Sequence, residues 1–456
     1  MQPNYLKGKK ILFANFPADG HFNPLTGLAI YLANKGADVR WYTSKAYSKK
    51  IQNLGFPHYR FKKALEVSNN EIDKVFPDRT KIKSQLSKLK FDIINVFVLR
   101  GPEYYQDIRE LYREFQFDLM VCDCAFTGSI FVKELMNIPV IAIGVLPLSN
   151  SSKDLPPAGL GMAPSHNIFG KIKEAILRKL TDRVIFGKPN KVLWKVCDEY
   201  RIPHNRESVF DMLASKADYF LQSGAPGFEF RRSDMLRNIR FMGPLLPKSR
   251  KQNDQPQWFD ERLNKYQKVV LVTQGTVETD ASKLLIPALE GFKDTNILLV
   301  VTTGGSMTAA LKEKYPHKNI IIEDFIPFDD VMPYADVYIT NGGFGGVMLG
   351  IENRLPLVVA GLHEGKNDIC ARVGYFKIGI NLKTERPAAS QLLGAVYKVL
   401  KDPQYKENVE RLSDEFLQYD PEELMIKYTT ALFRREKRKK VQPVFMRIPG
   451  ITGVAS

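Results

Sequence analysis

Residues 324–373 read DFIPFDDVMPYADVYITNGGFGGVMLGIENRLPLVVAGLHEGKNDICARV, and this stretch predicts a strand, a glycine turn, a helix and a second strand. The apolar runs VYIT (337–340) and LPLVVAG (355–361) bracket a helix-length segment that begins inside the turn. We expect that helix to begin near Gly346 and to offer unpaired N–H groups and the positive end of its dipole. The glycines of the turn carry no Cβ, so the backbone can approach an anion: Gly342, Gly343, Gly345 and Gly346. The stretch indicates a phosphate-binding turn, although glycine pairs also serve as ordinary strand-to-helix turns.

Both halves of the 456-residue chain repeat this alternation of strand and helix. The first half opens with a strand, a break and an amphipathic helix in KKILFANFPADGHFNPLTGLAIYLANKG (9–36), and DVRWYTS (38–44) follows as a second strand. The pattern restarts at KVVLVTQGTVET (268–279), after a polar and proline-flanked stretch. We therefore predict two doubly wound parallel-sheet domains of the α/β class, which face each other across a cleft.

The composition shifts set the predicted domain boundaries. We place a first domain at 1–246, a linker at 247–258, a second domain at 259–414 and a tail at 441–456. We expect the C-terminal helix, at about 415–440, to pack back on the first domain. The segment 56–115 reads as irregular, and its many aromatic side chains could line an apolar pocket or simply belong to the core.

The net charge of +16 would concentrate anionic ligands or favour an anionic membrane surface, although a solvated basic surface is the plainer interpretation. Basic residues are denser at Lys81–Lys90, Lys171–Arg183 and Arg434–Lys440. No nucleic-acid-binding module is recognisable, so we expect no nucleic-acid partner. No apolar run reaches the ~20 residues that cross a bilayer, and we expect a cytoplasmic protein. The four cysteines lack metal-site spacing, so we expect no disulfide and no bound metal.

Two polar residues stand near predicted strand ends in the first half. His21 lies in the loop after the first strand, and Asp123 ends the apolar run FDLMVC (117–122). Ligands of open α/β sheets bind at the carboxyl ends of the strands, so both residues are suitably positioned. A neutral imidazole can accept a proton, and a carboxylate on its other nitrogen fixes the tautomer. A core histidine or a capping aspartate is the alternative for each residue alone.

Taken together, PADGHFNPL around His21, VCDCAF around Asp123, TQGT (273–276) and the stretch 324–373 resemble the family 1 glycosyltransferases of the GT-B fold. They are most similar to the bacterial macrolide and natural-product branch of that family. The resemblance implies that His21 is the general base and that Asp123 supports it. It also implies inverting, metal-independent transfer of a sugar, with UDP-glucose as the expected donor and no other cofactor. The expected acceptor is a hydroxyl of a small hydrophobic molecule such as a flavonoid, macrolide or terpenoid, and we expect a monomer or homodimer.

The resemblance implies that the first domain (1–246) binds the acceptor and that the second domain (259–414) binds the nucleotide-sugar donor. Phe325 would stack on the nucleobase while the backbone of Ile326 reads its edge, and Glu364 would bind sugar hydroxyls. The full implied set is Gln274, Gly275, Thr276, Phe325, Ile326, Asn341, Gly342, Gly343, Gly345, Gly346, Glu364, Lys366 and Asn367.

Three positions depart from the family pattern and leave other functions open. Asn341 stands where histidine is usual, Gly346 where serine or threonine is usual, and Leu349 where a ribose-binding glutamate is usual. A non-catalytic nucleotide-sugar binding protein is therefore an alternative. Another is a glycosyltransferase with a membrane lipid or carotenoid acceptor, docked weakly through the basic surface. A sugar-nucleotide epimerase of the same fold is a third.

Overall fold

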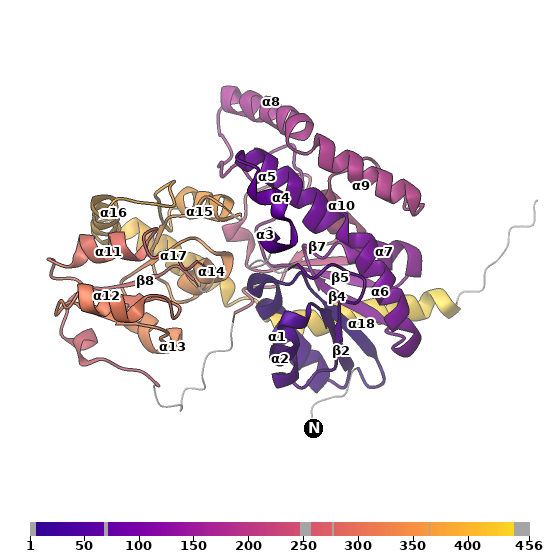
Figure 1. The fold of residues 1–456 in the computed structure, drawn as a ribbon, viewed down its shortest axis with the longest axis horizontal. Coiled ribbons are helices and arrows are strands. Elements are labelled where there is room, and N and C mark those ends of the chain that lie inside the picture. Colours follow the sequence, from indigo (N-terminus) through magenta and orange to yellow (C-terminus); the bar gives the residue numbers. More distant parts are fainter. Residues whose placement is uncertain (1–5, 68–71, 247–256, 276–277, 364, 442–456) are drawn as a thin grey trace, which may run out of the picture.

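The computed structural model describes residues 6–67, 72–246, 257–275, 278–363 and 365–441, which form two parallel sheets (Figure 1). The first sheet contains β1 (Lys10–Ala14), β2 (Asp38–Thr43), β3 (His58–Arg60), β4 (Leu119–Asp123), β5 (Val140–Gly144), β6 (Tyr219–Gln222) and β7 (Ile239–Phe241). The second contains β8 (Val269–Thr273), β9 (Leu298–Thr302), β10 (Ile320–Glu323), β11 (Val337–Thr340), β12 (Leu357–Val359) and β13 (Gly379–Asn381). The predicted fold class, two doubly wound α/β units, is confirmed.

Each sheet reverses its strand order at its centre. The orders are β3-β2-β1-β4-β5-β6-β7 and β10-β9-β8-β11-β12-β13, so β1 lies beside β4 and β8 lies beside β11. The loops after two such neighbouring strands leave the sheet in opposite directions and open a crevice between them. The fold therefore provides one crevice in each half, at the carboxyl ends of its central strands.

Apolar packing covers both faces of each sheet. Along β1, Ile11 and Phe13 belong to one core cluster, whereas Leu12 and Ala14 belong to the cluster on the other face. Strands buried on both faces must be apolar throughout, which is why the central strands are recognisable in the sequence as short apolar runs.

Helices pack around both sheets (Figure 1). The first half has α1 (Asp19–Asn34), α2 (Ser48–Asn53), α3 (Ile72–Val75), α4 (Pro77–Thr80), α5 (Gln85–Asp92), α6 (Arg100–Glu114), α7 (Gly128–Met136), α8 (Ile168–Val184), α9 (Gly187–Glu199) and α10 (Val209–Lys216). The second has α11 (Leu285–Phe292), α12 (Thr308–Lys314), α13 (Phe328–Val331), α14 (Phe344–Glu352), α15 (Lys366–Tyr375), α16 (Ala389–Lys401) and α17 (Pro403–Phe416), and α18 (Pro421–Val441) ends the described chain. Among the residues described, no helix is long and apolar enough to cross a membrane.

The segment 56–115 is largely helical, so the prediction of an irregular segment is wrong. It contains α3 to α6, and a π-helical turn at Ile93–Val98 joins α5 to α6. Gly101 and Pro102 look like helix breakers, but a proline in the first turn of a helix removes only an N–H that has no intrahelical partner. Several of the aromatic side chains, among them Tyr104, are part of the core.

The last helix lies against the first half of the molecule. In α18, Met425, Ile426 and Leu432 belong to the same core cluster as Phe22 of α1. Tyr31 of α1 also donates a hydrogen bond to Glu423 of α18. Figure 1 shows α18 running beneath the first sheet. The predicted linker, apart from Gln257 and Trp258, and the predicted tail after position 441 lie outside the described residues.

Candidate active site

His21 and Asp123 meet at the crevice of the first half. Nδ1 of His21 lies 2.6 Å from Oδ1 of Asp123, although the two residues are 102 positions apart in the chain. Asp123 ends β4 and is fully buried, while the side chain of His21 is 15% exposed. A carboxylate can only accept, so Nδ1 carries the proton and the neutral ring presents Nε2 as a base. The sequence predicts a loop position for His21, but the structure places it in the first turn of α1, which begins at Asp19.

Backbone hydrogen bonds fix the orientation of Asp123. The N–H of Phe16 donates to Oδ2 at 2.7 Å, and the N–H of Ala125 donates to Oδ1 at 2.8 Å. These bonds come from the loops after β1 and β4, so the crevice itself orients the carboxylate. A carboxylate held in this way keeps the imidazole in a single tautomer and ring orientation.

Aromatic rings adjoin the His21–Asp123 pair. The ring of Phe16 meets that of His21 edge to face at 5.6 Å and stacks on Phe97 at 5.0 Å. Phe97 comes from the π-helical turn before α6, and no local pattern in the sequence assigns it to this site. The surroundings of the imidazole are therefore apolar on this side.

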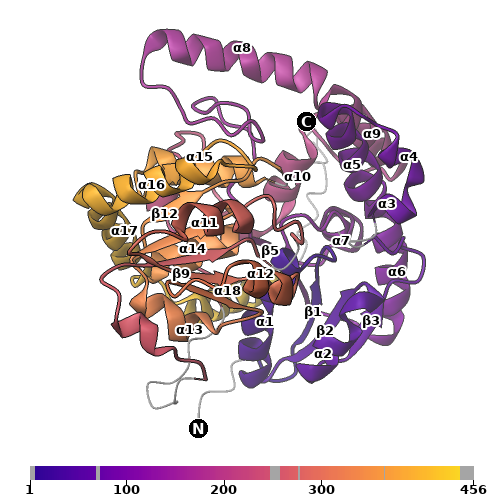
Figure 2. The same cartoon turned by 60° about the vertical axis from the view of Figure 1, so that its left-hand side comes forward.

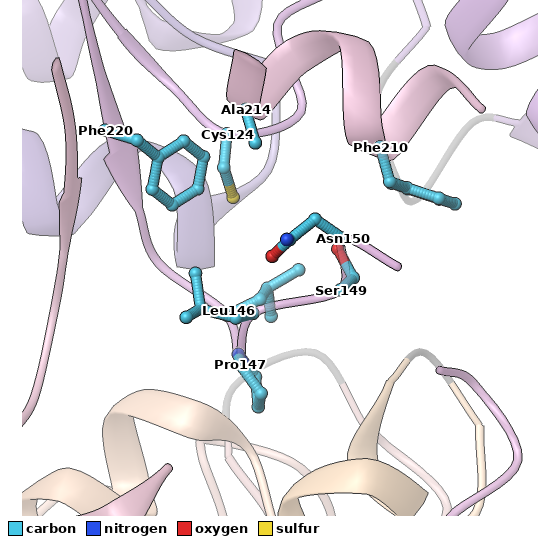
Figure 3. A pocket seen from close by; sticks show the side chains of 9 residues that line it. Cys124, Leu146, Pro147, Ser149, Asn150, Phe210, Ala214 and Phe220 are labelled. Carbon is cyan, nitrogen blue, oxygen red and sulfur yellow. The ribbon is translucent and has the colours of Figure 1, made fainter. Parts of the chain in front are cut away.

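A small apolar pocket lies beside the same strands (Figure 3). It opens to solvent, and the thiol of Cys124 is part of its lining. The other side chains come from the segment after β5, from β6 and from α10, and include Leu146, Phe210 and Phe220. Burial raises the pKa of the Cys124 thiol to about 12, so this sulfur stays protonated at neutral pH.

In the second half, Phe325 is an exposed aromatic ring at the carboxyl end of β10. It is 65% exposed, and a Cβ added to Gly305 in the loop after β9 would lie 3.5 Å from its ring. Ile326 turns its side chain into the core, so only its backbone could face a ligand. The ring of Phe325 is therefore open for stacking, and Ile326 can present main-chain groups to a ligand.

The glycine turn leads into α14, which begins at Phe344, two residues before the predicted start at Gly346. Its N-cap is Gly343, and no side chain caps the helix N-terminus. A Cβ at Gly345 would meet nothing within 4 Å, so that backbone is open to a ligand. Gly342 differs, because its φ is +78° and a Cβ there would lie 2.4 Å from Sγ of Cys370. Packing against Cys370 therefore requires a glycine at position 342, and the predicted role of Gly342 beside an anion stays a prediction.

Replacing Gly342 by alanine is expected to destabilise the protein. The positive φ alone costs a residue with a Cβ about 1–3 kcal/mol, and the collision with Cys370 adds to that cost. Gly345→Ala is the matched control, because position 345 is helical and open, and alanine is at least as good as glycine there. Urea denaturation of the two variants measures the difference, and equal stability would contradict the assigned role of Gly342.

A polar pocket lies beside the turn at the carboxyl ends of β8, β11 and β12. It is lined by Gln274, Asn341, Gly361 and Lys366, among others, and it opens to solvent. Oε1 of Gln274 is buried and has no hydrogen-bond partner in the described part of the chain. The amide of Asn341 donates to the carbonyl of Gln274 and accepts from the N–H of Gly343, so it ties the two loops together. Thr276 and Glu364, both predicted donor ligands, lie outside the described residues, and Gly275 has a φ of +77° beside this pocket.

The N-terminus of α15 contacts the first half. Asp368 accepts the N–H groups of Gly159 and Gly161 at 2.6 and 2.7 Å, and Asn367 donates to the carbonyl of Gly159 at 2.6 Å. These glycines belong to the segment between β5 and α8. Asn367 therefore has a partner in the other half of the molecule, and its predicted role as a donor ligand stays a prediction.

A buried ion pair also joins the halves. Arg372 of α15 donates through Nε, at 3.1 Å, and through Nη2 to Oε1 of Glu229. Its guanidinium lies over the ring of Phe230, 4.3 Å from the centroid. The partners are 143 positions apart, and no pattern in the sequence indicates the pairing.

Solved structures share this architecture. The calicheamicin glycosyltransferase aligns with a TM-score of 0.71 and 19% identity, over 95% of this chain and 99% of that one. The glycosyltransferase of kitacinnamycin aligns with a TM-score of 0.70 and 18% identity, over 96% and 100%. Two facing doubly wound units with a crevice in each define the GT-B fold.

Comparison with other sequences narrows the class to a family. The family model described as UDP-glucoronosyl and UDP-glucosyl transferase matches residues 105–420. The 4'-demethylrebeccamycin synthase of Lentzea aerocolonigenes is 33% identical over 413 residues, which cover 91% of this chain and 97% of that protein. UDP-glucosyltransferase 1 of Beauveria bassiana is 29% identical over 88% of this chain and 91% of its own length. The chain belongs to the UDP-glucoronosyl and UDP-glucosyl transferase family, and it is a glycosyltransferase.

Proposed function

We propose that this enzyme transfers glucose from UDP-glucose to a hydroxyl of a small hydrophobic natural product, with inversion and without a metal ion. The acceptor oxygen attacks the anomeric carbon from the side opposite the diphosphate. The bond from that carbon to the phosphate oxygen breaks and UDP leaves, while the hydroxyl proton passes to Nε2 of His21. Asp123 stabilises the imidazolium that results.

The hydrogen bond between His21 and Asp123 is the observation that carries this proposal. A sugar hydroxyl or phenol is a weak nucleophile at neutral pH, and a positioned general base accelerates its attack by ~10² to 10⁴. The 2.6 Å contact orients the ring, and the partial exposure of His21 leaves Nε2 accessible to an acceptor. A protein that only bound nucleotide sugars would have no need of this pair.

Three features of the second half support a nucleotide-sugar donor. The exposed ring of Phe325 suits stacking on a base, and the open N-terminus of α14 suits a diphosphate. Lys366 lines the adjoining polar pocket and can offset charge on the leaving group. The unpartnered Oε1 of Gln274, in the same pocket, would be satisfied by a sugar hydroxyl.

The same groups can act without a metal ion, because helix N–H groups and a lysine disperse the charge of a departing diphosphate. Within the described ranges, His, Cys, Asp and Glu side chains form no group of three or more that could hold a metal ion. A hydrophobic acceptor is supported by the aromatic rings beside His21 and by the name of one relative, 4'-demethylrebeccamycin synthase.

A transfer assay with UDP-glucose and a panel of phenolic and polycyclic acceptors tests the proposal. We expect a glucosylated product, detected by mass spectrometry, and the same rate in the presence of EDTA. Loss of activity in EDTA that added Mg²⁺ or Mn²⁺ restores would contradict the metal-independent mechanism. Donor hydrolysis without transfer to any acceptor would contradict the proposed acceptor class.

Ligand-induced stabilisation tests the donor site separately from catalysis. A nucleotide at 100 times its Kd should stabilise the folded protein by about 2.7 kcal/mol, and the melting temperature should rise accordingly. We expect UDP and UDP-glucose to give larger shifts than thymidine diphosphate or its glucose ester. Gly345→Ala should reduce these shifts, because it adds a methyl group to the open backbone of the turn, whereas Tyr397→Phe on the exposed face of α16 should not. Larger shifts with thymidine diphosphate would change the assigned donor.

A further inference from the structure

Helix α8 turns its apolar side chains away from the rest of the protein. Phe169 is 85% exposed, Ile168 is 74% exposed and Ile176 is 61% exposed. Residues spaced four apart lie along one side of a helix, so these positions form a continuous stripe. The exposed apolar side chains of α8 are Ile168, Phe169, Ile172, Ile176, Leu180 and Val184.

The side of α8 that contacts the protein is polar instead. Glu174 and Thr181 are buried, and Glu174 accepts the N–H of Ser165 at 2.6 Å. Arg178 donates to the carbonyl of Leu155 at 2.6 Å. A surface helix of a water-soluble domain normally packs its apolar stripe on the core and exposes its polar face. The reversed orientation of α8 leaves a large apolar stripe without a partner among the residues that the structure describes.

Basic side chains border the stripe. Lys171, Lys173, Lys179 and Arg183 are all exposed on α8. Of the acidic residues of this helix, Glu174 points into the protein and only Asp182 is exposed. An apolar stripe bordered by lysine and arginine is the pattern of helices that lie in the interface of an anionic bilayer.

We propose that α8 docks this enzyme on the surface of an anionic lipid bilayer. The stripe enters the boundary between headgroups and acyl chains, and the bordering cations contact the phosphates. A second copy of the chain is a poorer occupant, because its equivalent helix would bring the same four cations together and each chain carries a net charge of +16. This inference concerns where the enzyme sits, so it does not depend on the proposed donor or acceptor.

The position of α8 suits a flat partner. Figures 1 and 2 both show α8 at the outer edge of the molecule, apart from the two sheets. The chain that leads into it, after β5, carries the glycines that bind Asp368 at the start of α15. Docking would therefore bring the bilayer close to a segment that contacts both halves of the molecule.

Sedimentation of the full-length protein with vesicles tests the proposal. We expect binding to vesicles of phosphatidylcholine with phosphatidylglycerol, weaker binding to phosphatidylcholine alone, and release at raised salt. Ile172→Glu/Ile176→Glu should lower the affinity at least ~tenfold, because two side chains of the stripe become charged. Lys173→Gln/Lys179→Gln should lower it by roughly 25-fold, since each basic residue contributes roughly fivefold at an anionic surface.

Control variants with the same changes in charge, placed elsewhere on the surface, show whether vesicle binding depends on α8 or only on the net charge of the protein. Tyr397→Glu/Leu417→Glu places the same charges at exposed apolar positions of the second half, and Lys398→Gln/Lys401→Gln removes the same charges from α16. Both controls should bind vesicles like the unaltered protein, and circular dichroism should show that all variants are folded. The proposal is wrong if the unaltered protein fails to bind anionic vesicles at low salt, or if the α8 variants bind as well as their controls. A different result would assign the stripe to a second copy of the chain: the unaltered protein does not bind vesicles and forms a dimer, and Ile172→Glu/Ile176→Glu dissociates that dimer.

Discussion

We expect His21→Ala to lower the rate of sugar transfer at saturating substrates by ~10² to 10⁴, the contribution of a positioned general base. The variant leaves the acceptor hydroxyl without a group to take its proton, while the donor site in the other half is untouched. The KM for the donor should therefore change little, and the loss should appear in kcat. Initial rates from chromatographic product analysis measure both quantities.

Asp123→Asn tests the partner of the base with almost no change in volume. The asparagine amide would donate to Nδ1 of His21, so Nε2 would carry the proton and could no longer accept one. The comparable change in a hydrolase triad lowers kcat about 10⁴-fold. His317→Ala is a suitable control, because His317 precedes β10 at the amino end of the strand, away from the carboxyl-end crevice. A variant of His21 or Asp123 with the activity of the control would exclude the assigned mechanism.

The sequence is most informative where local chemistry determines structure. Strands such as VYIT (337–340) are apolar because helices cover both sheet faces, and the glycine turn is marked by residues without Cβ atoms. His21 and Asp123 were both predicted at strand ends, and the parallel pairing of β1 with β4 brings them together. The contact between His21 and Asp123 follows from the parallel sheet, which the alternation of strands and helices in the sequence already predicts.

The features that the sequence does not reveal depend on partners far away in the chain. Asn341 binds the backbone of Gln274, and Asn367 binds Gly159, because packing brings those loops close. No property of either asparagine indicates such a partner.

For the stripe of α8, a local pattern in the sequence leads to the wrong expectation. Its four-residue spacing is visible in the sequence, but periodicity alone predicts a stripe that faces the core.

Removing Glu229 from its ion pair with Arg372 should lower the free energy of unfolding by about 3–5 kcal/mol, because the buried guanidinium of Arg372 loses its counter-ion. The surroundings predict an order for the two changes. Glu229→Gln leaves Arg372 facing Arg232, which lies 3.7 Å from the same carboxylate, so two buried cations remain. Burial lowers the pKa of Arg232, and Glu229 opposes that shift, as expected for a counter-ion. Arg372→Met leaves Glu229 with Arg232, so we expect it to cost less than Glu229→Gln.

Urea unfolding followed by circular dichroism measures these costs, with Lys312→Met as the control. Lys312 pairs with Glu323 at 2.9 Å on the surface, and its loss should cost no more than about 1 kcal/mol. Because Glu229 and Arg372 come from different halves, their variants should also separate the unfolding of the halves into two transitions. The double variant Glu229→Leu/Arg372→Met should lose less than the sum of the single losses, because one buried cation, Arg232, then loses the carboxylate, whereas Glu229→Gln leaves two. Additive losses, or a cost no larger than that of Lys312→Met, would mean that the pair does not couple the two halves.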